Sequence, residues 1–384
     1  MRIVIVPSWY PTEDNPINGV FFKEQAKALQ KAGHDVTVLY PEIWTSRMLN
    51  VPKGDKGISF ELEDGIKTYR FRGYNFIPGR VPFSTATVFY YRLQKLYKKY
   101  VDQEGKPDVF HAHSCLWAGW ATAKLTESEN IPFLLTEHSS AFIRGLIRAY
   151  EKKEISYACK RAEFIISVGP GLAKKLESYT QPEKLTIIPN IVDIGKFTID
   201  KTKLEHGAFR FFSVAFLNHN KGMDILIQSF AKYFINKPVE LVIGGDGQER
   251  QALELLAKNL GVDKQVLFLG ELDREQVRDE IQKAHVFVLA SRFETFGVVF
   301  IEALACGKPI ISTACGGPEM IVNEINGKLV QVEDIDGLGQ AMKYMEENYD
   351  TYNAEDIRND CVSRFSEESV VTKITKLYEQ VLRV

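Results

Sequence analysis

The chain has 384 residues, of which 45% are apolar and 26% are charged, and its formal net charge is −2. This length suits two domains, and the near-neutral charge excludes a strongly basic nucleic-acid-binding protein, so we expect no nucleic acid among its partners. The five cysteines form no Cys-x-x-Cys pair, no signal peptide is recognisable, and no apolar run approaches the roughly 20 residues of a membrane span. These features predict a cytoplasmic protein with reduced thiols.

The N-terminal residues predict a strand–helix–strand unit. An apolar run at 2–6 precedes a loop with three prolines, and an amphipathic helix at 22–33 leads to a second apolar run at 34–40. The loop is unusually long, and such loops are more often functional than ornamental. Gly19 stands near its end, just before the helix.

Residues 41–101 follow a less regular pattern. The alternation at 58–71 predicts a hairpin that turns at 63–65, and residues 88–101 predict a helix rich in aromatic side chains. Two interpretations of this helix stay open: a core-facing aromatic stripe with a solvated basic face, or an interfacial helix attracted to anionic lipid. The bases concerned are Arg92, Lys95, Lys98 and Lys99.

Four further apolar runs alternate with helical segments and therefore predict a parallel sheet. The first of them ends in His111 and His113, of which we expect one to be structural and one to face a cleft. For His138, after the second run, we expect a structural role. No Cys or acid completes a zinc pattern around these histidines. The runs span residues 108–114, 133–139, 162–169 and 184–193.

A polar stretch at 198–206 predicts the boundary between two domains. Beyond it, five more apolar runs between 209 and 313 again alternate with helical segments. We therefore predict an α/β fold of two Rossmann-like domains, residues 1–198 and 199–365. A final amphipathic helix, at about 366–384, is expected to pack back on the first domain.

The stretch 291–319 carries the strongest functional signal. It predicts a turn after the buried strand 285–290, a helix, another strand and a second helix opened by Pro318. Glu294 falls in the turn and Glu302 in the first helix. The carboxyl edge of a parallel sheet binds ligands, helix N-termini attract anions, and carboxylates accept hydrogen bonds from hydroxyl groups. The stretch therefore suits a ligand with a phosphate and several hydroxyls, such as a nucleotide sugar.

Together these motifs resemble the retaining glycosyltransferases of family 4, whose GT-B fold has two Rossmann-like domains with parallel sheets facing across a cleft. The resemblance extends over nearly the whole chain, and its specific part is the Glu294/Glu302 pair with its flanking sequence. The matching sequences are N-G-V-F at 18–21, D-V-F-H-A-H-S at 108–114, T-E-H at 136–138, I-I-P-N-I-V-D at 187–193, N-K-G-M-D at 220–224, G-G-D-G at 244–247, F-E-T-F-G at 293–297, E-A-L-A-C-G-K-P-I-I at 302–311 and G-G-P-E at 316–319.

The resemblance implies that the C-terminal domain binds the nucleotide sugar and the N-terminal domain binds the acceptor. Glu302 would accept hydrogen bonds from the ribose, and the loop at Gly19 would close over the phosphates. The implied catalytic residues are Glu294 beside the donor sugar, Lys221 at the diphosphate and His113 near the transferred sugar. The other donor-binding residues that the resemblance implies are Asn190, Gly245, Thr295, Phe296 and Gly297.

Two departures from the family pattern affect the expected donor site. Phe216 stands where the family often has an arginine that shares the diphosphate, and Ile191 stands where a glycine is common. Either another base replaces the arginine, or Lys221 and backbone amides suffice. A lysine and helix N-termini can stabilise a departing diphosphate by themselves, so we expect neither a metal nor a cofactor.

Family prevalence makes a UDP-sugar the expected donor of a hexosyl or N-acetylhexosaminyl group. Aromatic and basic residues at 44–101 and 141–153 predict a glycan or lipid-linked acceptor, with peripheral contact to an anionic membrane. Such a protein would act in cell-envelope or exopolysaccharide synthesis. Two alternatives stay open: a nucleotide-sugar epimerase of similar fold, and a non-catalytic protein that binds nucleotide sugars.

Overall fold

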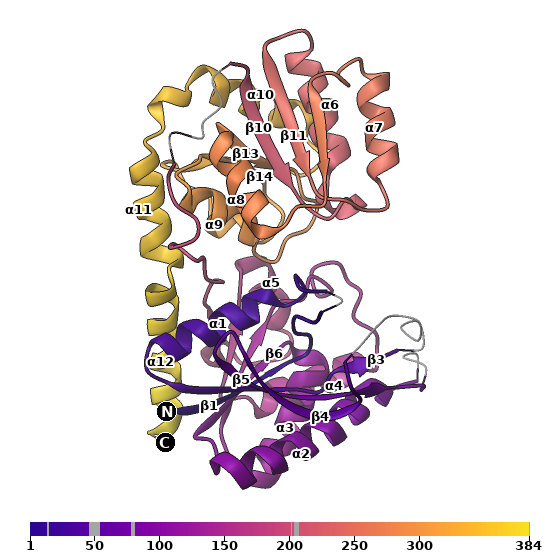
Figure 1. Cartoon of the computed structure of the whole chain (residues 1–384), viewed down its shortest axis with the longest axis vertical. Coiled ribbons are helices and arrows are strands. Elements are labelled where there is room, and N and C mark those ends of the chain that lie inside the picture. The colour runs from indigo at the N-terminus through magenta and orange to yellow at the C-terminus, as the bar shows by residue number, and fades with distance from the viewer. Residues whose placement is uncertain (14, 46–53, 78–80, 201, 203–206, 384) are drawn as a thin grey trace. The chain divides into compact units, whose positions relative to one another are not determined.

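The computed structural model describes residues 1–13, 15–45, 54–77, 81–200, 202 and 207–383. They form two compact α/β units (Figure 1). Unit 1 comprises residues 1–168, 172–191 and those from 370 onward, and unit 2 comprises residues 169–171 and 192–369. The chain therefore leaves unit 1 at Ile191 rather than at residue 198, and the polar stretch 198–206 lies in part outside the described residues.

Unit 1 is built on a mostly parallel sheet, which has nine strands among the described residues. The strand order is β3-β5-β2-β1-β6-β7-β8-β9, and β4 pairs antiparallel with β5. Ile3 of β1 pairs with Val36 of β2 and with Val109 of β6, and it is fully buried, as expected for a central parallel strand. The strands are β1 Arg2–Pro7, β2 Asp35–Tyr40, β3 Ile43–Trp44, β4 Gly57–Glu63, β5 Ile66–Tyr74, β6 Val109–His113, β7 Phe133–Glu137, β8 Phe164–Ser167 and β9 Leu185–Ile187.

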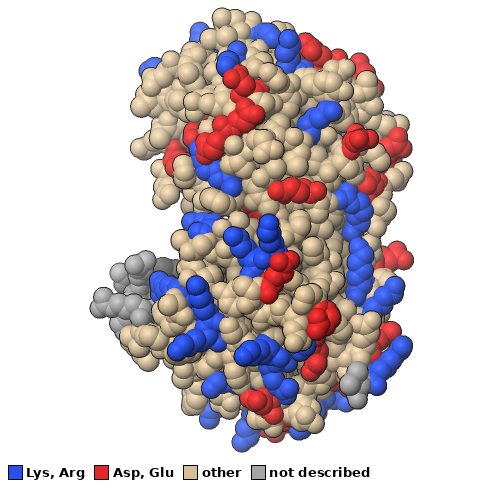
Figure 2. Space-filling model, turned by 180° about the vertical axis from the view of Figure 1, so that it is seen from behind, with Lys and Arg blue, Asp and Glu red and all other residues tan. Residues whose placement is uncertain are grey.

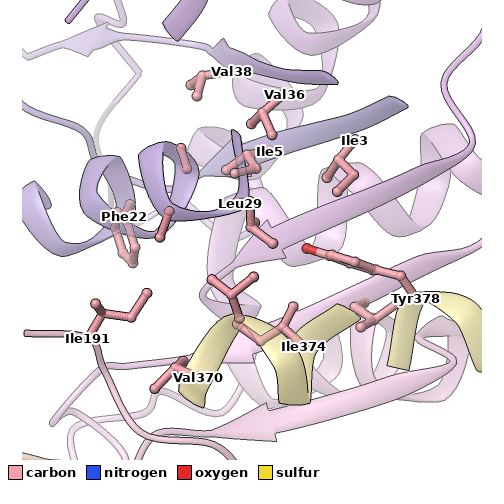
Figure 3. Close-up of a cluster of buried hydrophobic side chains, with 14 of the residues drawn as sticks. Ile3, Ile5, Phe22, Leu29, Val36, Val38, Ile191, Val370, Ile374 and Tyr378 are labelled. Carbon is pink, nitrogen blue, oxygen red and sulfur yellow. The ribbon is translucent and has the colours of Figure 1, made fainter. Parts of the chain in front are cut away.

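The helices α1 and α12 pack together in unit 1, although they come from opposite ends of the chain. Phe22 and Leu29 of α1 share one buried cluster with Ile374 and Tyr378 of α12 (Figure 3). The last helix thus packs on the N-terminal unit from Val370 onward. The helices are α1 Val20–Lys31, α2 Ser84–Glu104, α3 Trp120–Glu129, α4 Glu151–Arg161, α5 Pro170–Leu176 and α12 Glu367–Leu382, with an irregular turn at Cys115–Gly119 and a 3-10 turn at Pro182–Lys184.

The hairpin and the aromatic helix of unit 1 both form, with one correction. β4 and β5 pair from Gly57↔Arg72 to Glu63↔Ile66, so the chain turns at 64–65 as expected. The helix α2 buries Arg92, which donates hydrogen bonds of 2.7–3.0 Å to three backbone carbonyl groups. Arg92 therefore does not belong to a solvated basic face: its guanidinium ties α2 to the polar backbone at the ends of neighbouring strands.

Unit 2 has an entirely parallel sheet in the order β12-β11-β10-β13-β14-β15. Phe211 of β10 pairs with Leu241 and with Val286, and all three are fully buried. The strands are β10 Phe209–Val214, β11 Val239–Gly244, β12 Val266–Gly270, β13 Val286–Leu289, β14 Ile310–Thr313 and β15 Gly327–Val330. The helices are α6 Met223–Phe234, α7 Arg250–Asn259, α8 Arg274–Lys283, α9 Val298–Ala305, α10 Ile335–Glu347 and α11 Ala354–Phe365, with 3-10 turns at His219–Lys221, Pro318–Met320 and Tyr349–Thr351.

The helix expected after Gly317 is only the three-residue 3-10 turn Pro318–Met320. Glu319 folds back and accepts the backbone N–H of Gly316 at 2.8 and 2.9 Å, which closes the turn locally. No helix within the described ranges is long and apolar enough to cross a membrane.

Candidate functional site

The carboxyl end of β13 in unit 2 leads into the turn and helix that carry both glutamates. All four residues of β13 are buried, and the chain then turns through Glu294 into α9, which begins after Gly297. Gly297 has φ 97°, a left-handed conformation that glycine adopts without strain. Glu302 lies within α9, and its side chain is almost completely buried.

Lys221 and Glu294 come together across the edge of this sheet. Lys221 ends a 3-10 turn in which the Asn218 side chain accepts the backbone N–H of Asn220, and the amine of Lys221 forms an ion pair with Glu294. Gly222 follows with φ 61°, and a Cβ there would collide with the carbonyl oxygen of Ala290. The absence of a side chain at Gly222 therefore lets the lysine turn approach the end of β13. The side chains of Lys221 and Glu294 are 25% and 13% exposed, so a ligand can reach the pair.

Arg292 joins the two turns, a role that no local pattern around it predicts. Its guanidinium donates to both carboxylate oxygens of Asp224 at 2.8 and 2.9 Å and to the carbonyl of His219 at 2.5 Å, and it also pairs with Glu333. These hydrogen bonds raise the pKa of Arg292, and those to Asp224 contribute the most. Burial acts to raise the pKa of Asp224, but the bonds from Arg292 outweigh it and keep that pKa low. Arg292 is thus a fixed cation that holds the Lys221 turn against the Glu294 turn.

Glu302 is paired with a second arginine that sequence reasoning missed. Arg274, the first residue of α8, donates from Nη2 to Oε1 of Glu302 at 2.6 Å. The two residues are 28 positions apart in the chain. No local spacing signal connects them, and only the packing of α8 beside α9 brings them together.

An exposed phenylalanine occupies the position at which the family often has the diphosphate-binding arginine. Phe216 is 65% exposed, and it lies in the loop after β10. Gly245 approaches this loop so closely that a Cβ would collide with the carbonyl oxygen of Ala215, and its φ is 107°. Gly245 is therefore explained by backbone packing, and a phosphate contact at Gly245 stays a prediction.

Thr295 and Phe296 lie between the two glutamates. Phe296 is buried and packs edge-on against Phe365 at 5.8 Å between ring centroids, so its side chain serves the core. The backbone of Thr295 lies so close to Gly169 that a Cβ on that glycine would collide with it. Any ligand contact of Phe296 would therefore come from its backbone, as the resemblance implies, and a ligand contact of Thr295 stays a prediction.

Gly19, His113 and Asn190 belong to unit 1. Gly19 begins α1 in a left-handed conformation, φ 77°, and a Cβ there would press on the backbone oxygen of Trp9 at 2.9 Å. Asn190 is buried after β9. Their donor contacts stay predictions.

The three histidines of unit 1 form one buried cluster. His111 is satisfied on both ring nitrogens, by the hydroxyl of Tyr378 at 2.6 Å and that of Thr136 at 2.7 Å, so it is structural. His113 Nδ1 lies 3.1 Å from His138 Nε2. Within the described part of the chain, His113 Nε2 and His138 Nδ1 have no hydrogen-bond partner.

Burial keeps these histidines neutral. It lowers the pKa of His111 and of His138 to about 3 and that of His113 well below its usual value. Neighbouring Glu137 orders the surrounding loops: its carboxylate accepts the backbone N–H of Cys115 at 2.6 Å and that of His138 at 2.7 Å. A neutral His113 can act as a hydrogen-bond partner for a sugar but not as a cation.

The sequence contains one Asp-x-Asp pattern, Asp334-Ile335-Asp336. The expectation of a metal-free site does not consider this pattern, so its two carboxylates need an explanation. Asp334 caps α10 through a 2.8 Å bond from the N–H of Gly337, and Asp336 pairs with Lys232 at 2.5 Å. Both carboxylates therefore have structural partners. The described residues contain no group of three or more His, Cys, Asp or Glu side chains placed to hold a metal.

Two family profiles match adjoining parts of this chain, which together span residues 19–360. The profile described as Glycosyltransferase Family 4 matches residues 19–196, and the one described as Glycosyl transferases group 1 matches residues 196–360. The chain belongs to the group 1 glycosyltransferases of family 4. The first profile covers most of unit 1, and the second covers the Lys221–Glu294 turns and α9.

Individual relatives of this glycosyltransferase are distant. TuaC of Bacillus subtilis, named for teichuronic acid biosynthesis, is 27% identical over 366 residues, which is 89% of this chain and 88% of TuaC. Sucrose-phosphate synthase from Thermosynechococcus elongatus has a TM-score of 0.82 at 20% identity, with 100% of both chains covered. Anabaena HepE, solved in complex with UDP, has a TM-score of 0.76 at 18% identity, with 99% of this chain and 100% of HepE covered. The two structures show the shared GT-B fold.

Proposed function

We propose that this glycosyltransferase moves a hexosyl or N-acetylhexosaminyl group from a nucleotide sugar, first of all a UDP-sugar, with retention of configuration and without a metal. The observation that carries the proposal is the Lys221–Glu294 ion pair at the carboxyl edge of the unit 2 sheet. It joins a cation suited to a diphosphate with a carboxylate suited to sugar hydroxyls. Glu302 adds a second carboxylate for the ribose.

In the proposed reaction the acceptor hydroxyl attacks the anomeric carbon from the face that the diphosphate leaves. The bond between that carbon and the diphosphate oxygen breaks, the new glycosidic bond forms, and the hydroxyl proton passes to the departing diphosphate. Lys221 stabilises the negative charge that develops on the leaving group. Glu294 positions the sugar and does not form a covalent intermediate. His113 is the proposed hydrogen-bonding residue of unit 1.

We propose a glycan or lipid-linked acceptor for unit 1, in cell-envelope or exopolysaccharide synthesis, as the name of TuaC supports. The described residues of unit 1 line a cavity of about 380 Å³ beside the start of α1. Buried Arg70 lies there, held by Glu63 at 2.6 Å and Glu42 at 3.1 Å. Fixed carboxylates and a guanidinium of this kind are suited to hydroxyl-rich groups.

A peripheral position on the cytoplasmic membrane face is also proposed. Figure 2 shows Lys and Arg side chains interspersed with Asp and Glu over the visible face of unit 1. Lys95 and Lys98 of α2 are exposed, whereas Arg92 is buried. Flotation with vesicles of phosphatidylglycerol and phosphatidylcholine is expected to carry part of the protein upward at low salt. Absence of binding to these vesicles would rule out the membrane contact.

The test of function is incubation of the protein with UDP- and GDP-sugars and with lipid-linked glycan acceptors, followed by mass spectrometry. Elongated acceptor is the expected product. Conversion of the donor into its epimer would favour the epimerase alternative. Binding of the donor, seen as a higher melting temperature, without any product would favour a non-catalytic binding protein.

A further inference from the structure

The ion pair between Arg274 and Glu302 has a role that the family resemblance does not assign. We infer that Arg274 is a positioning residue for nucleotide binding: it keeps the Glu302 carboxylate ionised and oriented toward the ribose hydroxyls. This inference rests on the proposed function, because it takes the ligand of unit 2 to be a ribonucleotide.

Glu302 requires a cation where it lies. Its side chain is only 7% exposed, and a carboxylate removed from water is strongly destabilised unless it is paired and hydrogen-bonded. Arg274 supplies this partner through the 2.6 Å bond to Oε1. Loss of the guanidinium would remove this charged hydrogen bond from the buried carboxylate and so make its ionised, oriented form less stable.

Arg274 is itself held on two sides. Its backbone begins α8 in a capping box, in which the Asp273 side chain accepts the N–H of Gln276 and the Gln276 side chain accepts the N–H of Asp273. Its guanidinium also lies over the ring of Phe197, 5.6 Å from the centroid. A guanidinium fixed at both ends loses little further freedom when it holds a carboxylate, so it can set the direction of that carboxylate.

The pair is compatible with ribose binding. An ionised carboxylate has about four acceptor positions, so one bond from Arg274 does not prevent further bonds from hydroxyl groups. A protonated Glu302 would carry a donor in place of one acceptor and would suit two ribose hydroxyls less well. The ionised state that Arg274 maintains is therefore the state that the ribose needs.

A different role for Arg274 would be to replace the diphosphate arginine that is absent at Phe216. The observed bond goes to Glu302, whereas the carboxylate beside the proposed diphosphate position, Glu294, is paired with Lys221. The geometry therefore favours the ribose. The two roles differ in what they predict for a nucleotide that lacks the 2′-hydroxyl.

The experiment measures dissociation constants by calorimetry for the wild type and for Arg274→Gln, with Arg274→Lys as a milder variant should the first not fold. Arg278→Gln is the matched control, because Arg278 lies on the same helix but pairs with Asp279. The probes are UDP, GDP and ADP, the 2′-deoxy form of whichever binds, and inorganic pyrophosphate. A hydrogen bond to a charged group is worth about 1.5–3 kcal/mol, so the wild type should bind the ribonucleotide roughly 10-fold or more tighter than the deoxynucleotide.

For Arg274→Gln we expect roughly 10-fold weaker binding of the ribonucleotide, a clearly smaller loss for the 2′-deoxynucleotide, which keeps only the 3′-hydroxyl for Glu302, and no change in the control. Equal losses for both nucleotides and for pyrophosphate would show a diphosphate contact and overturn the inference. Unchanged binding of both nucleotides would also overturn it, leaving the proposed function intact. A wild type that binds none of the three ribonucleotides would overturn the proposed function and this role with it.

Discussion

Replacement of Glu294 by Gln should strengthen the binding of UDP, although Glu294 belongs to the proposed donor site. In the structure the Lys221 amine is already neutralised by Glu294. A diphosphate must compete with that carboxylate for the lysine. Glu294→Gln removes the competitor while it keeps the size of the side chain. UDP lacks the donor sugar that Glu294 is proposed to position, so its binding does not depend on that contact.

The magnitude follows from the partial burial of the pair. Two unit charges about 4 Å apart interact by about 4 kcal/mol at an effective dielectric constant near 20, which is an upper bound here. The 25% and 13% exposure of the side chains reduces this value, and coupling between contacting charged residues is about 0.5–3 kcal/mol. We expect a gain of about 1–2 kcal/mol, or roughly 5- to 30-fold tighter binding of UDP.

The assay is calorimetric titration with UDP at low and at high salt, since screening should shrink the gain. Lys221→Met should act in the opposite direction and weaken UDP binding. Glu319→Gln is the control, because Glu319 is held by the backbone of Gly316 rather than by a lysine. Weaker or unchanged binding of UDP by Glu294→Gln would refute the competition between carboxylate and diphosphate.

Three stability predictions follow from buried or strained positions. Tyr378→Phe should lower the free energy of unfolding by about 1–3 kcal/mol, because it leaves His111 Nδ1 without its buried partner. Gly222→Ala should cost more than about 1 kcal/mol, because a left-handed backbone and the Ala290 carbonyl both oppose a Cβ. Burial lowers the pKa of Lys308 to about 8, so its charge opposes folding fully below pH 8 and progressively less up to the ordinary lysine value. Lys308→Met should therefore stabilise the fold by about 1–3 kcal/mol at pH 7, and this gain should shrink between pH 8 and about pH 10.

Urea unfolding at fixed pH measures the first two changes, and a pH series measures the third. Tyr344→Phe is the control for Tyr378, since Tyr344 is 44% exposed and should change stability little. Gly33→Ala is the control for Gly222, because Gly33 also has a positive φ but nothing lies within 4 Å of its Cβ position. Equal losses for Gly33→Ala and Gly222→Ala would contradict the role of the Ala290 contact. A gain from Lys308→Met that does not change with pH would contradict the assigned charge.

Most of the fold could be predicted from the sequence because local patterns determine it. Apolar runs between helical segments indicate parallel strands, and the turn at 64–65 follows from the residues that flank it. The change of polarity at residue 198 predicts a boundary between the units there. The chain leaves unit 1 at Ile191, where no change of composition marks the crossing.

The site could be predicted only in part. Glu294 and Glu302 were found because their spacing and flanking residues are local features. Their partners Lys221 and Arg274 lie 73 and 28 positions away, and packing alone decides which cation meets which acid. Arg292 illustrates the limit most clearly: its sequence neighbours give no indication of Asp224 in α6, whose carboxylate pairs with it.

The most direct test of the central claim is the kcat/KM of glycosyl transfer for Glu294→Ala and Lys221→Ala beside the wild type, with circular dichroism to verify folding. Loss of one group that stabilises developing charge typically costs about 100-fold to 1,000-fold in rate. We predict a fall of at least roughly 100-fold for Lys221→Ala and a comparable fall for Glu294→Ala in the folded proteins. Near wild-type kcat/KM in both variants would contradict the assignment of this edge of unit 2 as the donor site.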